Sequence, residues 1–498
     1  MSNRIGNVRN VAPSTNGKPH KRVVQVESPD PLPPFSNYSG DVPLAIDDIR
    51  KSLLALTDGW PKCISGVLCY ATPDGVRPLQ DTAELFAWIA GKTLIEWKRG
   101  SRAVSKEEFF KRLHQRKRWD WATPHPHFPP LPGVLYLADP PGAENTGKLD
   151  ELIDRFCPKT WADRELIKAL ILTLFWGGPP GKRPQFAIVA DESSDEFAGR
   201  GTGKTTLVQY LARLVGGCVD IDHSASHDRI TSNLLSPSSW GARVVLLDNL
   251  KTSRFSSDFL EKLITRDEIT GHRLYTGFAT RPNLLTWIAT VNGAYFSTDM
   301  AMRSVVIRLN RPPDTAEDWD AKTVRFMEKY RAEIVADVRW HLEELEPANL
   351  NRVDRWATWC LQVLSRCKRP NKLLSHICEQ RDSIDADKTE MTLALDHLRG
   401  CIASHFSANG PSFALDTSVV WAPTAWFVQA LRALKRDLTD RQAQQFMARL
   451  VSTKRFHKAP TKSQRGYCWV GAKVDLENLP VQRDILYRPE VPSQRQRG

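Results

Sequence analysis

Five short, mostly apolar runs divide the middle of the chain, and polar stretches with helical spacing separate them. Apolar runs of this length predict buried strands. Strands that alternate with helices in this way predict a parallel sheet that is covered on both faces. The predicted strands are Phe186–Ala190, Cys218–Ile221, Val244–Leu247, Leu284–Thr290 and Val305–Leu309.

The pattern of apolar positions changes on either side of this region. Before it, short helical and strand-like stretches mix, and after it, residues 316–405 follow helical spacing almost throughout. The stretch from 415 to 471 predicts two helices and then a basic hairpin. We therefore divide the chain into a disordered basic tail (1–43), an N-terminal α+β domain of unknown role (44–135), a helical segment (136–180), an α/β core (181–312), a helical domain (313–408), a small C-terminal domain (409–472) and a flexible tail (473–498).

The composition favours a polyanionic partner. The 498 residues carry a formal net charge of +12 at a pI of about 9.2, and 41% of them are hydrophobic. That hydrophobic fraction is enough to form buried cores, so the chain as a whole is not disordered. A basic chain favours nucleic acid above all, with an anionic membrane surface as the alternative.

The cysteines and the longest apolar run indicate in which cellular compartment the protein is expected. Nine cysteines are scattered along the chain without a CxxC pair, which favours reduced thiols in a cytosol. We interpret Cys360, Cys367 and Cys378 as buried helical residues, with structural metal ligands as the alternative. The run Leu166–Trp176 is too short to span a bilayer, so we expect a cytoplasmic protein without a membrane partner.

The segment Ala198–Thr205 matches a phosphate-binding loop, with alanine in place of the first glycine. Its glycines allow backbone N–H groups to curl around phosphate oxygens, and the following helix presents its positive N-terminus. We expect Lys204 to reach the β and γ phosphates of ATP and the Thr205 hydroxyl to bind Mg²⁺. The residues assigned to nucleotide binding are Ala198, Gly199, Gly201, Thr202, Gly203, Lys204, Thr205 and Thr206.

Polar residues after two later strands complete the candidate site. Asp248 ends the third predicted strand, at the sheet edge where parallel sheets hold their ligands, so it is the second candidate Mg²⁺ ligand. Asn292 follows the fourth predicted strand and is a candidate for orienting the attacking water or for sensing the γ-phosphate. Each residue alone fits an ordinary strand end, whereas beside the phosphate loop both become candidate catalytic residues together with Lys204.

Arg303 stands two residues before the last predicted strand, Val305–Leu309. An arginine at this position can enter the site of a neighbouring subunit and neutralise charge that develops on phosphate. Such an arginine contributes roughly 10³–10⁵ in rate where the effect has been measured. We count Arg303 as the fourth candidate catalytic residue, with a surface salt bridge as the alternative.

These four elements, in this order, resemble superfamily 3 helicases of the AAA+ class. The likeness is nearest to the helicase part of phage, plasmid and poxvirus-type primase-helicases, and it covers roughly residues 150–345. It implies a P-loop, three-layer α/β core that uses ATP and Mg²⁺. It also implies a homo-hexamer that acts on single-stranded or duplex DNA during replication of a phage, plasmid or mobile element, near the nucleoid of a bacterial or phage-infected cell.

The segment Phe259–Tyr275 strengthens the resemblance, because it looks like a helix followed by a β-hairpin. In the family this hairpin projects into the central pore of the ring and grips the strand that is moved. The alternative for each cation in this segment is ordinary solvated charge. By the likeness, the candidate DNA contacts are Lys262, His272, Arg273 and Arg281.

The sequence departs from the family after Asp248. A second acidic residue normally follows and acts as the general base, whereas this chain has Asn249, which cannot accept a proton. Hydrolysis is then expected to be slow, unless another carboxylate such as Asp258 or Glu261 serves. The N-terminal part carries no primase motif, so we expect any priming to need a separate primase or polymerase.

The C-terminal domain resembles a winged helix, in which a recognition helix and a basic hairpin contact DNA. The second predicted helix would present polar side chains to a groove, and the hairpin would present cations to phosphates. The alternative is a small domain that packs against the ATPase or against a partner. The candidate contacts are Arg441, Gln445, Arg449, Lys462 and Arg465.

The sequence therefore supports an ATP-dependent DNA helicase-like motor as the first functional hypothesis. Asn249 favours a second hypothesis, a DNA-tethered AAA+ nucleotide switch or initiator with weak hydrolysis. A third is an antiphage or mobile-element ATPase that acts on a protein partner.

Overall fold

The computed structural model of the chain describes residues 34–73, 75–115, 118–190, 203–236, 239, 241–250, 255–273, 277–292, 295–312, 316–407, 419–435, 438–451, 456–458 and 466–471. These residues fall into two compact units. The first comprises the described residues up to 118, apart from a short stretch at 72–75, and the second comprises the rest. In the described segments, no helix is both long and apolar enough to cross a membrane.

The first unit is a small α+β domain with its own apolar core. Its main sheet has the strand order β6-β5-β4-β8, and three helices supply core side chains such as Ile49, Leu85 and Phe109. Ser105 caps the last helix, since its side chain accepts a hydrogen bond from the Glu108 amide. The elements are β1 Phe35–Ser36, β2 Tyr38–Ser39, β3 Val42–Pro43, α1 Ile46–Leu56, β4 Lys62–Ile64, β5 Val67–Thr72, β6 Gly75–Leu79, α2 Thr82–Ala90, β7 Ile95–Glu96, α3 Lys106–His114 and β8 Arg118–Trp119.

The second unit is built on a five-stranded sheet with the order β12-β13-β16-β11-β17, in which every neighbouring pair is parallel. All residues of β16 are buried, and successive side chains of a strand point to opposite faces. Both faces of the sheet are therefore covered, and the predicted α/β fold with a parallel sheet is confirmed. The strands are β11 Gln185–Ala190, β12 Cys218–Asp220, β13 Val244–Leu250, β16 Thr286–Val291 and β17 Ser304–Leu309.

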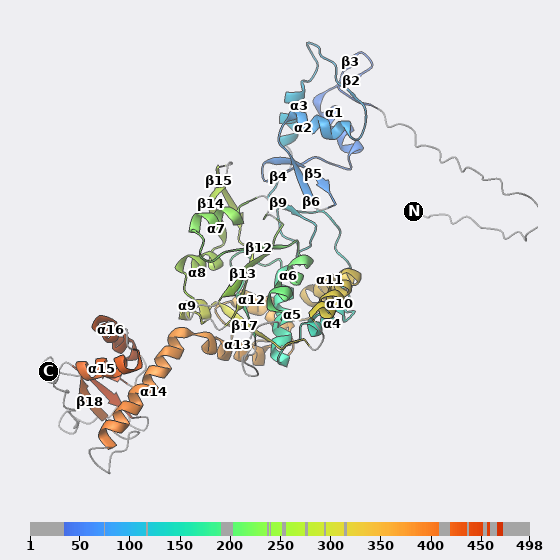
Figure 1. The fold of residues 1–498 in the computed structure, drawn as a ribbon. Helices are drawn as coiled ribbons and strands as arrows, with labels where there is room; N and C mark the ends of the chain where they lie inside the picture. Colours follow the sequence, from blue (N-terminus) through green and yellow to red (C-terminus); the bar gives the residue numbers. More distant parts are fainter. Residues whose placement is uncertain are drawn as a thin grey trace, which may run out of the picture. The chain divides into compact units, whose positions relative to one another are not determined.

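Helices and short strands surround this sheet (Figure 1). Helix α6 packs against four of the five strands, whereas α5 and α13 pack against β17. The elements of this part are β9 Trp121–Thr123, β10 Val134–Tyr136, α4 Lys148–Arg155, α5 Trp161–Phe175, α6 Lys204–Leu214, α7 His227–Leu234, α8 Asp258–Thr265, β14 Glu268–Arg273, β15 Gly277–Pro282, α9 Thr298–Ala301, α10 Ala316–Lys329, α11 Arg331–Arg339, the π-helix η2 Trp340–Glu344, α12 Ala357–Gln362, the 3-10 helix η3 Leu364–Arg366, α13 Pro370–Ile384 and α14 Ala386–Ser407.

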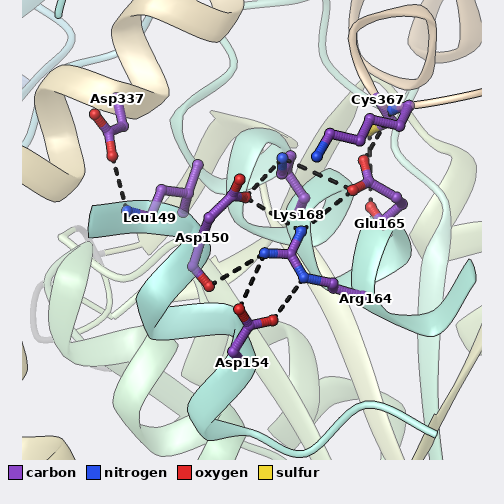
Figure 2. A network of polar contacts seen from close by, with 9 residues as sticks. Leu149, Asp150, Asp154, Arg164, Glu165, Lys168, Asp337 and Cys367 are labelled. Carbon is purple, nitrogen blue, oxygen red and sulfur yellow. Dashed lines mark hydrogen bonds and ion pairs between the residues drawn. The ribbon is translucent and has the colours of Figure 1, made fainter. Parts of the chain in front are cut away.

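A polar network joins the helices that precede the sheet to one that follows it (Figure 2). The buried ammonium of Lys168 on α5 lies 2.7 Å from a carboxylate oxygen of Asp150 on α4. Arg164 on α5 pairs with Asp154 at 2.6 Å. Asp337 on α11 accepts a 2.8 Å hydrogen bond from the Leu149 amide, in the first turn of α4. Because buried charges must be paired, this network fixes α4, α5 and α11 relative to one another.

Two buried arginines donate hydrogen bonds to backbone carbonyls at and near the end of α5. Arg243, next to β13, donates to the carbonyls of Leu174 at 3.0 Å and Pro126 at 2.8 Å. Arg183 donates to the Trp176 carbonyl at 2.7 Å. Burial lowers the pKa of each guanidinium to about 9. Carbonyl groups at a helix end need donors, and cations are favoured there, so these arginines anchor α5 beside the sheet.

The last part of the chain forms a separate apolar core with a three-stranded antiparallel sheet of order β18-β20-β19. The two predicted helices and both hairpin strands are present. The sequence analysis missed β18, which pairs with β20. Ala394, Leu398 and Ile402 of α14 belong to this core, so α14 packs with the C-terminal helices and strands. The elements are β18 Val419–Pro423, α15 Thr424–Leu434, α16 Asp440–Leu450, β19 Phe456–Lys458 and β20 Gly466–Val470.

Candidate functional site

The N-terminus of α6 carries the described end of the predicted phosphate loop. Residues 198–202 of that loop lie outside the described residues, and Gly203, Lys204, Thr205 and Thr206 lie within them. Gly203 precedes the helix at φ +75°, a left-handed conformation that glycine adopts without strain. A Cβ at this position would lie 3.4 Å from the Trp319 ring, so the close approach also favours glycine.

Asp248 lies near the end of β13, two residues before the strand ends, and contacts the start of α6. Its Oδ1 accepts a 2.8 Å hydrogen bond from the Thr205 hydroxyl and another of 2.5 Å from the Thr290 hydroxyl. The pair Thr205 and Asp248 thus presents a hydroxyl and a carboxylate in direct contact. Mg²⁺ prefers oxygen ligands and is usually held by one or two carboxylates plus phosphate oxygens, so this pair fits the ion.

Asn249 interrupts the regular register of β13. The pairing with β16 shifts between Leu247 and Leu250, and Asn249 has φ +57°. Asparagine is one of the few residues that adopts this left-handed conformation readily. Its backbone N–H donates to the Thr290 hydroxyl at 2.7 Å instead of to the strand ladder.

Asn292 connects the two sides of the site. Its Oδ1 accepts a 2.6 Å hydrogen bond from the Lys204 ammonium, and its Nδ2 donates to Asn249 Oδ1 at 2.7 Å. Lys204 is largely buried, with 6% of its surface exposed. The structure therefore brings together Lys204, Thr205, Asp248 and Asn292, as the sequence predicted, at the carboxyl edge of a parallel sheet.

Two residues at this edge were missed by the sequence analysis. Thr290 bridges Asp248 and Asn249. Its position two residues before Asn292 was the available signal, since residues two apart in an extended chain share a face. Asp220 ends the neighbouring strand β12, in register with Leu246. Burial raises the pKa of Asp220, and the nearby charge of Asp248 raises it further.

Arg303 lies at the opposite, amino edge of the sheet. Its carbonyl accepts the Gln185 amide at the start of β11. Its side chain is 12% exposed and donates to the Asp299 carbonyl at 2.6 Å. Glu261 lies 3.6 Å from this guanidinium and accepts a hydrogen bond from Ser297. Glu261, one of the two alternative general bases, therefore contacts Arg303 and Ser297, and among the described residues it makes no hydrogen bond or ion pair with Lys204 or Asp248.

The predicted hairpin is present as β14 and β15, which pair in antiparallel register directly after α8. Lys262 on α8 and His272 on β14 are exposed, as a contact with DNA requires. The structure contradicts the prediction that Arg281 contacts DNA, because its side chain is buried. Arg281 is 7% exposed and donates to the carbonyls of Leu234 and Ser239. Burial also lowers its pKa to about 10. Arg281 anchors the base of the hairpin, and the Arg273 side chain lies outside the described residues.

The C-terminal candidates lie partly on α16. Arg441 and Gln445 are exposed one helical turn apart. Arg449 is also exposed but pairs with Asp387 of α14 at 3.0 Å, so this contact competes with any phosphate. Lys462 and Arg465 lie outside the described residues.

The described ranges contain no cluster of side chains that could bind a metal ion by themselves. No group of three or more His, Cys, Asp or Glu residues there could hold an ion. Cys360 and Cys367 are buried and Cys378 is partly buried, each as a free thiol. A magnesium site at Asp248 would therefore need oxygens from a bound phosphate chain.

No protein-family model matches this chain, and no curated protein matches it. Solved structures give weak likenesses. The C-terminal region of NrS-1 is similar with a TM-score of 0.47 and 12% identity, over 82% of this chain and 95% of that one. A second structure of that region is similar with a TM-score of 0.45 and 13% identity, over 81% of this chain and 94% of that one. JCV helicase is similar with a TM-score of 0.26 and 11% identity, over 49% of this chain and 62% of that one. These scores carry no functional argument.

Proposed function

We propose that this chain is an ATP-dependent DNA motor of helicase type, which works as a ring of identical subunits. The observation that carries the proposal is the hydrogen-bonded group of Lys204, Thr205, Asp248 and Asn292 at the carboxyl edge of the parallel sheet. An ammonium, a hydroxyl, a carboxylate and an amide at a helix N-terminus are the groups that bind and hydrolyse a nucleoside triphosphate.

Each side chain takes a role that its contacts support. Lys204 would neutralise the β and γ phosphates, while Thr205 and Asp248 would hold Mg²⁺, which neutralises further charge on those phosphates. Asn292 lies within reach of Lys204 and so lies near the terminal phosphate, where it contacts the attacking water. Arg303, at the far edge of the sheet, reaches the site of the next subunit once assembly releases it from Asp299 and Glu261.

DNA binding is supported by two exposed features. The hairpin β14–β15 carries His272 and follows the exposed Lys262, and it would face a strand that runs through the ring. The arrangement of α14, α15 and α16 on a three-stranded antiparallel sheet supports a winged helix, with α16 as the element that enters a groove. The basic net charge of +12 favours both contacts.

A second candidate function is a DNA-tethered nucleotide switch. Asn249 favours it, because this residue occupies the position after Asp248 and bonds Asn292 through its amide. An amide cannot accept a proton from water, so the nucleotide would act mainly by controlling assembly.

ATP turnover with and without single-stranded DNA separates the two functions. The motor predicts at least several-fold stimulation by DNA, and loss of turnover and of nucleotide binding in Lys204→Ala. A matched control is Lys51→Ala, whose exposed ammonium pairs with Asp48 in the first unit. Nucleotide-dependent DNA binding with negligible turnover would favour the switch. Failure of the wild-type chain to bind nucleotide with Mg²⁺ would exclude both.

A further inference from the structure

The orientation of the Asn292 amide is determined by its two neighbours. A lysine ammonium is a donor only, so the Asn292 atom 2.6 Å from Lys204 must be the oxygen. The amide nitrogen then faces Asn249, and it needs an acceptor there. Asn249 supplies that acceptor, its side-chain oxygen, at 2.7 Å.

The conformation of Asn249 makes this contact possible. Asn249 lies in the register shift of β13 at φ +57°, and its N–H is held by the Thr290 hydroxyl. The backbone is thereby fixed through a group that also bonds Asp248. An exposed side chain on a fixed backbone can then reach across to β16 at little cost to the fold.

We propose that Asn249 is a positioning residue, which fixes the Asn292 amide with its oxygen toward the phosphate end of the site. The inference rests on the proposed nucleotide site and specifies how that site works. In the free chain the Asn292 oxygen accepts from Lys204. Once phosphate oxygens accept the hydrogen bonds of the Lys204 ammonium, the Asn292 oxygen accepts a hydrogen bond from the attacking water instead. Asn292 therefore orients water and does not donate to the terminal phosphate, and no proton passes to either amide.

The side chain of Asn249 can be removed without straining the backbone. Glycine adopts a positive φ freely, so Asn249→Gly deletes the acceptor alone, and Asn249→Asp keeps an acceptor oxygen in its place. Asp58→Gly is the matched control, because Asp58 is also exposed and left-handed at φ +50° but lies in the first unit.

Single-turnover and steady-state ATP hydrolysis by the full chain tests the inference. Asn249→Gly is expected to lower kcat about tenfold, the usual effect of one lost hydrogen bond, with KM nearly unchanged. Asn249→Asp is expected to turn over at or above the wild-type rate, and Asp58→Gly at the wild-type rate. In an Asn292→Ala background, Asn249→Gly is expected to cost nothing further, because it acts through Asn292.

Several outcomes would overturn the inference. Wild-type turnover in Asn249→Gly would do so, as would an Asn249→Asp variant as slow as Asn249→Gly. An undiminished tenfold loss in the Asn292→Ala background would show that Asn249 does not act through Asn292. A wild-type chain that binds nucleotide without turnover would also overturn it, and would leave the nucleotide site standing. Absence of nucleotide binding would instead refute the proposed function itself.

Discussion

The ammonium of Lys204 lies 2.6 Å from the side-chain oxygen of Asn292, although 88 residues separate them in the sequence. One begins α6 and the other follows β16, and both are brought to the carboxyl edge of the sheet by parallel strands. The phosphates of a bound nucleotide would compete with Asn292 for the same ammonium.

This competition gives a prediction for Asn292→Ala. Loss of the amide releases Lys204, so the dissociation constant for a non-hydrolysable ATP analogue should stay the same or decrease. Turnover should fall about tenfold or more, because the water loses its acceptor. Isothermal titration and single-turnover hydrolysis measure the two quantities, with Asn351→Ala as an exposed control outside the site. Markedly weaker binding by Asn292→Ala would contradict the competition.

Asp248→Asn should weaken the affinity for Mg²⁺ without disturbing the fold. The amide oxygen can still accept from Thr205 and Thr290, whereas the negative charge is lost. Even indirect partners of a metal change its affinity by about 10–100-fold, so at least a tenfold rise in the Mg²⁺ concentration for half-maximal turnover is expected. A magnesium titration compares this variant with Asp139→Asn, which is exposed. An unchanged titration would remove Asp248 from the metal site.

Arg303 and Lys204 should complement each other between subunits. Each single alanine variant is expected to be inactive, with Arg303→Ala retaining nucleotide binding. A mixture should recover turnover, because some interfaces then combine an intact Lys204 with an intact Arg303. Mass photometry with an ATP analogue measures assembly in parallel. A chain that stays monomeric with nucleotide and DNA, or a mixture with no recovery, would refute the role of Arg303 in a neighbouring site.

Two cations near the hairpin should behave differently. Lys262→Ala is expected to weaken single-stranded DNA binding and to reduce the slope of log affinity against log salt by about 0.7, as expected for one lost phosphate contact. Arg281→Ala should lower the free energy of unfolding by about 2 kcal/mol, because the Leu234 and Ser239 carbonyls lose their donor. Fluorescence anisotropy across a salt series and urea unfolding measure these effects. Equal stability of Arg281→Ala and the wild type would contradict its anchoring role.

His125 should make the second unit sensitive to acid. Burial, followed by the charges of Arg243 and Arg331, lowers the pKa of His125 to about 3, and its Nδ1 accepts from Arg331. The folded state then binds fewer protons than the unfolded state below pH 6.5. Stability that is fully present above pH 6.5 is therefore lost as the pH falls, by up to about 2 kcal/mol at pH 5.

A comparison of wild type and His125→Gln isolates this contribution. Glutamine can accept from Arg331 but does not titrate, so its unfolding free energy should fall less between pH 7.5 and pH 5. His127, whose pKa burial also holds well below its usual value, remains in both proteins. Chemical unfolding followed by tryptophan fluorescence gives the difference. An identical pH dependence in both proteins would rule out His125 as its source.

The parallel sheet was predictable because its strands are defined locally. Runs such as Val244–Leu247 are apolar at every position, and such a run is stable only where both faces are buried. The same applies to Asp248 and Asn292, since a polar residue directly after a buried strand must lie at the sheet edge. Sequence order along parallel strands then places these residues at one edge.

The tertiary structure decided the environment of each charge and the partners of each polar group. Arg281 and Lys262 are both cations near one hairpin, yet Arg281 is buried and donates to the carbonyl of Leu234 at the end of α7, whereas Lys262 is exposed. The left-handed Asn249 and its bond to Asn292 also depend on a register shift between strands far apart in the sequence. Apolar burial is an average property that local pattern encodes, whereas a hydrogen bond or an ion pair needs two particular atoms, and only the folded chain brings those together.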